Sequence, residues 1–166
     1  MHDPELSIRA VKSHETEAVV NIVEPIVRSA ESYAIEPDLS RKQIQDWWFS
    51  SEHEIRVAVH RDRIVGSYYL KANQRGPGSH IANCGYVTIA DFNRRGVGRA
   101  MCLDSMAVAR SRGFRAMQFN LVLKSNEPAL RLWSDMGFRE VGEVPMAYRL
   151  PSGDFVDGVI FFRSLE

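Results

Sequence analysis

The sequence predicts an α/β fold: a mixed sheet of seven strands with helices on both faces, in a single domain that spans residues 1–166. Two observations support this prediction. Seven short stretches are alternately or continuously apolar, as strands are, and four longer stretches carry apolar residues at helical spacing. In chain order they read βααβββαβαββ, an interleaving typical of sheets covered on both sides. A length of 166 residues suits one domain with its own core.

The first half of the chain is expected to hold a strand, two helices and a hairpin. Residues 6–11 alternate as a strand does, and a helical pattern starts at Ser13. Ser40 is the expected cap of a second helix. Two further apolar stretches, 54–60 and 63–70, flank a tight turn and are expected to pair as a hairpin.

The second half of the chain alternates strands and helices before it ends in two strands. Glycines at positions 113 and 137 follow the two expected helices, where a left-handed residue commonly ends a helix. The expected elements are a strand at 81–90, a helix at 97–112, a strand at 115–123, a helix at 126–136, and strands at 138–150 and 155–164.

The composition argues against several kinds of partner. Apolar residues make up 45% of the chain and charged residues 25%, and the formal net charge is zero. These are ordinary values for a globular domain, and no stretch approaches the length of a membrane-spanning helix. We therefore expect neither nucleic acid nor a membrane as a partner.

The two cysteines indicate the compartment. Cys84 lies in an expected strand and Cys102 in an expected helix, so both are interpreted as reduced core residues of a cytoplasmic protein. The polar N-terminus lacks the apolar segment of a signal peptide. His80 lies four residues before Cys84, which leaves a catalytic cysteine as an alternative to the favoured buried thiol.

A glycine-rich and arginine-rich turn carries the strongest functional signal. It joins the expected strand at 81–90 to the expected helix at 97–112. The start of a helix offers free backbone N–H groups and a partial positive charge. Gly96 and Gly98 remove side chains that would keep an anion away, and arginines at 94, 95 and 99 add positive charge. The turn therefore predicts a pyrophosphate site, with ordinary helix-capping glycines as the alternative.

The spacing of the glycines within the turn indicates which kind of pyrophosphate-containing ligand it binds. Met101 stands where a dinucleotide-binding fingerprint needs its third glycine, and no nucleotide-hydrolase phosphate loop is present. The run Asn93-Arg94-Arg95-Gly96-Val97-Gly98 resembles the acyl-CoA signature of GNAT N-acetyltransferases, Gln/Arg-x-x-Gly-x-Gly/Ala, except at its first position. Residues 125–138 resemble the second signature of that family, Asn-x-x-Ala-x-x-Leu-Tyr-x-x-x-Gly-Phe. With the order of elements, the resemblance covers about residues 6–164.

The resemblance implies the GNAT fold and the cosubstrate. In GNAT proteins a mostly antiparallel seven-stranded sheet splays at a bulge in the strand before the glycine turn, and pantetheine lies in the gap. Backbone groups of Val87, Thr88 and Ile89 would meet pantetheine and the thioester oxygen, although a plain buried strand explains the same residues. The implied cosubstrate is acetyl-CoA, and no metal is expected. Residues implied to bind it at the turn are Arg94, Arg95, Gly96, Val97, Gly98, Arg99 and Ala100.

The catalytic groups implied by the resemblance depart from the usual family pattern. Asn126 caps the helix at 126–136 and is expected to contact CoA as well. Trp133 stands where the family usually has a Tyr that protonates the leaving thiolate; an indole is no acid, but its N–H can donate to sulfur. Asn83 stands where many phosphinothricin-type relatives have a Glu base. Glu31 and Glu36 are alternative bases, with solvated surface as their favoured interpretation.

One branch of the family shares these departures. Residues 79–86 and 119–122, with Asn126, resemble the azetidine-2-carboxylate (proline-analogue) acetyltransferases of fungi. In that branch, asparagines matching Asn83, Asn120 and Asn126 serve substrate and cofactor. An amide offers both a donor and an acceptor, so Asn83 and Asn120 could hold a zwitterionic amino acid. The alternative for Asn120 is that it only satisfies backbone groups at a strand end.

The leading hypothesis is an acetyl-CoA-dependent N-acetyltransferase that acts on a small amine, either an amino acid or a toxic amino-acid analogue. Acetylation of a protein N-terminus or a lysine is the second hypothesis, mildly disfavoured by a neutral sequence without an obvious acidic groove. A non-catalytic acyl-CoA-binding regulatory module is the third, because Glu and Tyr are missing at the two acid–base positions. Family analogy alone adds a homodimer through the last strands.

Overall fold

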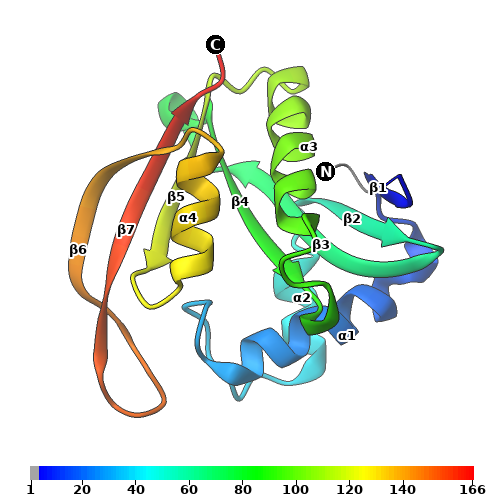
Figure 1. Ribbon diagram of the computed structural model, residues 1–166, viewed down its shortest axis with the longest axis horizontal. Helices are drawn as coiled ribbons and strands as arrows, with labels where there is room; N and C mark the ends of the chain where they lie inside the picture. The colour runs from blue at the N-terminus through cyan, green and yellow to red at the C-terminus, as the bar shows by residue number, and fades with distance from the viewer. Residues whose placement is uncertain (1–3) are drawn as a thin grey trace.

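The computed structural model describes residues 4–166 and places seven strands in one sheet (Figure 1). The strand order is β1-β2-β3-β4-β5-β7-β6, which confirms the predicted fold class. The strands are β1 (Leu6–Ala10), β2 (Glu54–His60), β3 (Arg63–Ala72), β4 (Ile81–Thr88), β5 (Ala116–Leu123), β6 (Arg139–Arg149) and β7 (Phe155–Ser164).

Helices cover both faces of the sheet, as the interleaved pattern predicts. One apolar core joins α3 and α4 to the sheet and includes Met101 and Trp133. A second core lies under α1 and α2 on the other face and includes Val23 and Trp48. The helices are α1 (Thr16–Ser29), α2 (Arg41–Trp48), α3 (Val97–Ser111) and α4 (Glu127–Asp135), with short 3-10 helices at Ser13–Glu15, Gly76–Gly78 and Ala90–Phe92.

The element boundaries follow the predicted ones closely, with physical reasons for the differences. The first helix begins as a 3-10 turn at Ser13 and becomes α-helical at Thr16. Ser40 caps α2 as predicted, since its Oγ accepts from the Gln43 N–H at 3.3 Å. The predicted strand at 81–90 ends at Thr88, because a 3-10 turn begins the glycine-rich connection at residue 90.

The sheet opens between β4 and β5. Within the described sheet these two strands are the one parallel pair, and they pair at only two positions near their starts. β4 keeps an unbroken register with β3 along its length. The expected bulge in β4 is therefore absent from the β3–β4 pairing, and the nearest register shift lies between Phe119 and Val122 of β5. The splay itself is as expected.

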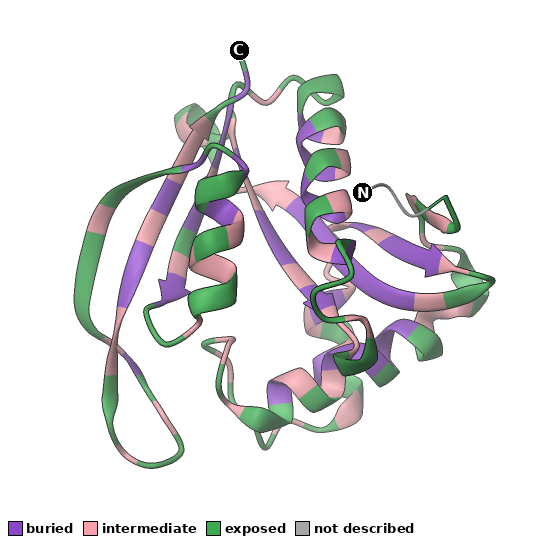
Figure 2. Ribbon diagram, in the orientation of Figure 1, coloured by how far each residue is buried: buried purple, intermediate pink, exposed green. Residues whose placement is uncertain are grey.

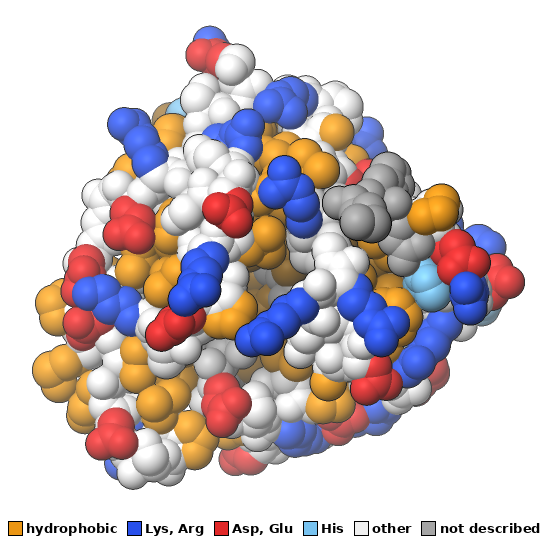
Figure 3. All heavy atoms as spheres, in the orientation of Figure 1, with side chains coloured by type: hydrophobic (Ala, Val, Ile, Leu, Met, Phe, Trp, Pro, Cys, Tyr) orange, Lys and Arg blue, Asp and Glu red, His pale blue; other side chains and the backbone are white. Residues whose placement is uncertain are grey.

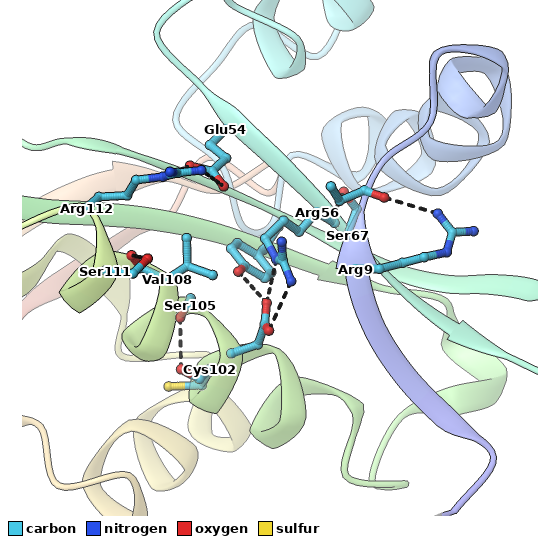
Figure 4. Close-up of polar contacts among 12 residues, drawn as sticks. Arg9, Glu54, Arg56, Ser67, Cys102, Ser105, Val108, Ser111 and Arg112 are labelled. Carbon is cyan, nitrogen blue, oxygen red and sulfur yellow. Dashed lines mark hydrogen bonds and ion pairs between the residues drawn. The ribbon is translucent and has the colours of Figure 1, made fainter.

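Polar contacts fasten α3 to the sheet beside this opening. The Arg56 guanidinium on β2 donates to Asp104 of α3 at 2.6 Å, and the buried Tyr68 hydroxyl of β3 donates to the same carboxylate at 2.7 Å (Figure 4). The next residue of α3, Ser105, shares a 2.7 Å hydrogen bond with the Tyr86 hydroxyl of β4. These contacts fix the middle of α3 relative to β2, β3 and β4, and the glycine turn is continuous with the start of this helix.

Burial is concentrated in the centre of the sheet and decreases toward β6 (Figure 2). β6 is an edge strand, and Val141, Val144 and Met146 on it are exposed, as is Phe155 at the start of β7. Among residues 4–166, no helix is long and apolar enough to cross a membrane, and no group of three His, Cys, Asp or Glu side chains could hold a metal ion.

Candidate active site

A cavity of about 820 Å³ lies where β4 and β5 separate. Its walls come from β4 and β5, from the first turn of α3, from the start of α4, and from residues 32–34 of the α1–α2 loop. Figure 3 shows a hollow in the middle of this face with Lys and Arg side chains around it. The gap predicted between the two strands is thus accessible from outside.

The first turn of α3 forms one end of the cavity. Arg94 and Gly96 both have positive φ, 62° and 79°, so the chain turns sharply from β4 into the helix. The Ala100 N–H donates to the Gly96 carbonyl at 2.9 Å, which leaves the N–H groups of residues 97–99 without intrahelical acceptors. A Cβ at Gly96 would meet no atom within 4 Å. Open space, free N–H groups and the helix dipole together fit an anion.

Gly98 has a packing role in addition to the one the sequence suggests. It lines the cavity, but a Cβ there would approach Leu132 Cδ2 of α4 at 3.1 Å. Its missing side chain therefore allows α3 and α4 to pack closely. Val97, also on the cavity wall, is buried in the core between these helices and the sheet.

The arginines of the turn divide into two kinds. Arg94 and Arg99 line the cavity, where their positive charge suits an anionic ligand. The Arg95 guanidinium lies over the Phe92 ring, 5.0 Å from its centroid, and Arg95 is not on the cavity wall. Ala100 is not on the wall either. For these two residues the structure does not support direct contact with a bound cofactor.

Of the three β4 and post-β4 residues expected to meet pantetheine through their backbone, only Thr88 directs its backbone groups to the gap. Backbone groups of successive strand residues point to opposite sides. The Ile89 N–H donates to the Val65 carbonyl of β3 at 3.0 Å, so Ile89 and Val87 direct their backbone groups to β3. This corrects the expectation for those two residues. The backbone groups of Thr88 and Tyr86 face the gap. Val87 still lines the cavity, whereas Ile89 does not.

Asn126 and Trp133 lie together on the α4 side of the cavity. Asn126 caps α4, its Oδ1 accepting from the Ala129 N–H at 3.2 Å. Its Nδ2 has no hydrogen-bond partner among the described residues, so capping and ligand contact are compatible. Trp133 is 7% exposed and packs against Phe119 at 4.6 Å between ring centroids. No fully buried side-chain nitrogen in residues 4–166 lacks a partner, so the unbonded indole nitrogen of Trp133, a residue of the cavity wall, is accessible to solvent.

The opposite side of the cavity carries the two predicted substrate amides and a third that sequence reasoning missed. Asn83 and Asn120 both line the cavity. Their Nδ2 atoms donate to one oxygen, Asn73 Oδ1, at 3.0 and 2.7 Å. Gln118 Nε2 in turn donates to Asn120 Oδ1 at 2.9 Å. The amides therefore form one hydrogen-bond network that joins β4 and β5 to Asn73, the residue after β3.

Two tyrosine hydroxyls hold the α1–α2 loop in place beside this side of the cavity. The Tyr33 hydroxyl of the α1–α2 loop donates to the Tyr86 carbonyl on the open edge of β4 at 2.9 Å. The Tyr148 hydroxyl of β6 donates to the Tyr33 carbonyl at 3.1 Å. The loop is therefore tied both to β4 and to β6. Neither tyrosine belongs to a motif, and no sequence pattern indicates that they meet.

Tyr69 and Gly85 form a further part of the wall that the sequence did not reveal. The two residues pair across β3 and β4, and the Tyr69 ring lies over the glycine. A Cβ at Gly85 would come within 2.4 Å of the ring and 2.8 Å of its hydroxyl oxygen. His53 stacks on the ring at 4.2 Å between centroids. Burial raises the Tyr69 pKa to about 12, so the phenol is a hydrogen-bond donor at neutral pH.

The match to a family model decides the identity of this site. Residues 20–138, more than half of the chain, match the model of the Acetyltransferase (GNAT) family. The chain belongs to the GNAT acetyltransferase family. It is therefore an N-acetyltransferase that depends on acetyl-CoA, and the alternative of a non-catalytic module is set aside.

Individual relatives agree with this assignment. The chain is 28% identical over 160 residues to N-acetyltransferase aca1 of Schizosaccharomyces pombe, an alignment that covers 84% of this chain and 77% of that protein. A GCN5-related N-acetyltransferase from Kribbella flavida is 34% identical, with a TM-score of 0.90 over 96% of this chain and 98% of that one. The structure of yncA from Salmonella typhimurium with its cofactor acetyl-CoA has a TM-score of 0.86 at 15% identity, over 98% and 95% of the two chains; it supports the fold alone.

The residues present fit the cosubstrate of a GNAT enzyme. Acetyl-CoA carries a pyrophosphate, and the turn before α3 offers free N–H groups with no side chain over them. Arg94 and Arg99 add two positive charges on the same wall. The gap between β4 and β5 leaves the backbone groups of Thr88 and the Tyr86 N–H on a strand edge without a partner strand, where an extended chain of amides such as pantetheine can bind. The Tyr86 carbonyl on the same edge already accepts from the Tyr33 hydroxyl.

The acid–base groups of this GNAT site are unusual. No Asp or Glu is among the described residues of the cavity wall, and Glu31 and Glu36 lie exposed outside it. Cys84 lines the cavity, but burial raises its thiol pKa far above the ordinary value, so it is no nucleophile at neutral pH. The His80 ring lies 3.1 Å from the Pro77 carbonyl, in an exposed loop. The interpretation of Cys84 as a structural thiol is therefore favoured over a catalytic one.

Proposed function

We propose that this GNAT enzyme acetylates the amine of a small molecule, and that its acceptor is an amino acid or an amino-acid analogue. The observation that carries the proposal is the acceptor side of the cavity. It offers two amides, Asn83 and Asn120, and no carboxylate. A carboxylate there would repel the carboxylate of an amino acid, whereas an amide N–H can bind it. The resemblance to azetidine-2-carboxylate acetyltransferases supports the same class.

The size and closure of the site favour a compact acceptor over a polypeptide. The Tyr148 hydroxyl of β6 donates to the Tyr33 carbonyl, and Tyr33 lines the cavity, so the α1–α2 loop is held beside the acceptor side. A polypeptide acceptor that approached over this loop would need the contact to open. We therefore retain protein acetylation only as the second candidate.

The chemistry needs a neutral amine, a stabilised oxyanion and a proton for the leaving thiolate. Acetyl-CoA supplies the acetyl group as a thioester. The acceptor side is lined by Tyr33, Tyr69 and Leu121 and has no carboxylate to stabilise an ammonium, so it lowers the pKa of a bound amine and favours its neutral form. A backbone N–H on the open edge of β4 would donate to the developing oxyanion. The indole N–H of Trp133 can donate a hydrogen bond to the thiolate sulfur but no proton. The proton that the attacking nitrogen loses as the C–N bond forms and the C–S bond breaks balances the one that the thiolate takes up.

The homodimer, the cytoplasmic location and the single domain remain predictions, each with some structural support. The exposed apolar side chains of Val141, Val144 and Met146 on the edge strand β6 support a homodimer through the last strands. The two buried, unpaired thiols support a reducing, cytoplasmic location. One sheet with cores on both faces supports a single domain over residues 1–166.

The proposed function is tested by measuring CoA release from acetyl-CoA with a panel of acceptors. The panel contains free amino acids, proline analogues, amines without a carboxylate, and a histone-type peptide. We expect turnover with one or more free amino acids or analogues and little with the peptide. Turnover with the peptide alone would assign the enzyme to the second candidate function.

A further inference from the structure

The amide network on the acceptor side has a centre that lies outside the cavity. Asn73 follows β3 and its backbone N–H donates to the Ile81 carbonyl of β4 at 2.8 Å, which fixes its position at the end of the hairpin. From there its side-chain oxygen accepts one N–H from Asn83 on β4 and one from Asn120 on β5. Asn73 itself is not on the cavity wall. It therefore contacts the substrate-side amides without contacting the substrate space.

An asparagine side chain can present either its oxygen or its nitrogen to a ligand, and the two ends have opposite hydrogen-bonding character. A neighbouring hydrogen-bond partner must therefore fix the orientation of the amide if it is to recognise one end of a zwitterion. At Asn83 this partner is Asn73: Asn83 Nδ2 donates to Asn73 Oδ1, and Asn83 Oδ1 has no hydrogen-bond donor among the described residues. Asn83 Oδ1 is then available to accept from an amine, and its second N–H to donate to a carboxylate.

We propose that Asn73 is a positioning residue of the acceptor site, which fixes the orientation of the Asn83 and Asn120 amides by accepting a hydrogen bond from each. This rests on the proposed function for its effect on catalysis. The orientation itself is a property of the free protein. Asn120 is held at both ends, since its Oδ1 accepts from Gln118 while its Nδ2 donates to Asn73. Asn83 is held at its Nδ2 end, through Asn73 alone among the described side chains, so it depends more strongly on Asn73.

The first arm of the test is nuclear magnetic resonance of the side-chain amide groups. Asn73→Ala should move the Asn83 and Asn120 NH₂ resonances upfield, because each loses its acceptor. Asn73→Asp keeps an oxygen at that place and should hold both resonances at or downfield of their wild-type positions. Gln118→Ala is the matched control, expected to move Asn120 but leave Asn83 in place. Unmoved Asn83 and Asn120 resonances in the folded Asn73→Ala protein would overturn the proposal.

The second arm is kinetic and uses an acceptor that the wild-type enzyme turns over. Asn73→Ala should raise the KM for the acceptor about tenfold, the size expected from losing one or two neutral hydrogen bonds, with the KM for acetyl-CoA unchanged. Because Asn73 acts through Asn83, the Asn73→Ala/Asn83→Ala double variant should be less impaired than the product of the two single effects. Equal rises in both KM values, or fully multiplicative effects, would indicate a merely structural role and contradict the proposal.

The two arms separate this proposal from the proposed function. If the wild-type enzyme acetylated only the peptide, the amino-acid assignment would fail while the resonance arm still decided whether Asn73 orients the amides. A thermal unfolding curve for each variant identifies any loss of activity that comes from loss of the fold.

Discussion

Replacing Gly85 with Ala should displace Tyr69 from the acceptor wall. The added Cβ would lie 2.4 Å from Tyr69 Cε1 and 2.6 Å from Cζ, far inside any van der Waals contact. The ring cannot retreat easily, because it stacks on His53 at 4.2 Å and meets Trp48 edge-on at 5.1 Å between centroids. Overpacking of this kind costs roughly 1–3 kcal/mol. For a chain of this size that corresponds to a fall in Tm of about 4–8 °C at the middle of the range.

Thermal unfolding followed by circular dichroism measures the fall in Tm. A changed KM for the acceptor would show that the Tyr69 phenol has moved from the acceptor wall. Gly142→Ala is the matched control, because a Cβ at that strand glycine would meet only Ile160 Cδ1, at an ordinary 3.5 Å. In a Tyr69→Ala background the clash is removed, so Gly85→Ala should then lower Tm very little. An equal fall in Tm in both backgrounds, or no fall in the wild-type background, would refute the reasoning.

Three further variants test other parts of the site. Gly96→Val should weaken CoA binding by tenfold or more, about 1.4 kcal/mol, when measured by calorimetry; Gly153→Val, which also forces a side chain into a positive φ with open space around it, should not. Trp133→Tyr should keep or raise kcat, and loss of turnover with fold and CoA affinity intact would reveal a specific role for the indole. Burial lowers the His53 pKa below its unfolded value, so the unfolded state binds the proton first as pH falls. Tm should therefore fall from pH 7.5 to pH 5.5, across the ordinary histidine pKa of about 6.5, and fall less in His53→Phe; identical slopes would contradict this.

The order of elements and the start of α3 could be predicted because they depend on local sequence. Apolar periodicity defines strands and helices, and Gly96 belongs to a recognisable run between a strand and a helix. Asn126 was predictable for the same reason, since a helix cap is a local feature. Asn83 and Asn120 were reached through resemblance alone.

The rest of the site depends on which residues lie opposite each other, and single-sequence patterns do not fix that. The register of β3 against β4 brings Tyr69 over Gly85 and turns the backbone of Val87 toward β3. Asn73 lies in a loop without a motif, and only the folded hairpin brings its oxygen to Asn83. For the approach of the Tyr69 ring to Gly85, the sequence offers one sign: a glycine inside a predicted strand, which often marks a close contact.

The most direct test of the account is the ratio of kcat/KM for azetidine-2-carboxylate to that for azetidine, compared between the wild-type enzyme and Asn83→Asp. These acceptors share the ring amine and differ in the carboxylate. Because an amide can bind that carboxylate and an aspartate repels it, we expect the wild-type enzyme to prefer the acid and Asn83→Asp to lose that preference, with CoA affinity little changed. An unchanged ratio in the folded variant, or a loss confined to CoA binding, would contradict the assignment of this cavity wall to an amino-acid acceptor.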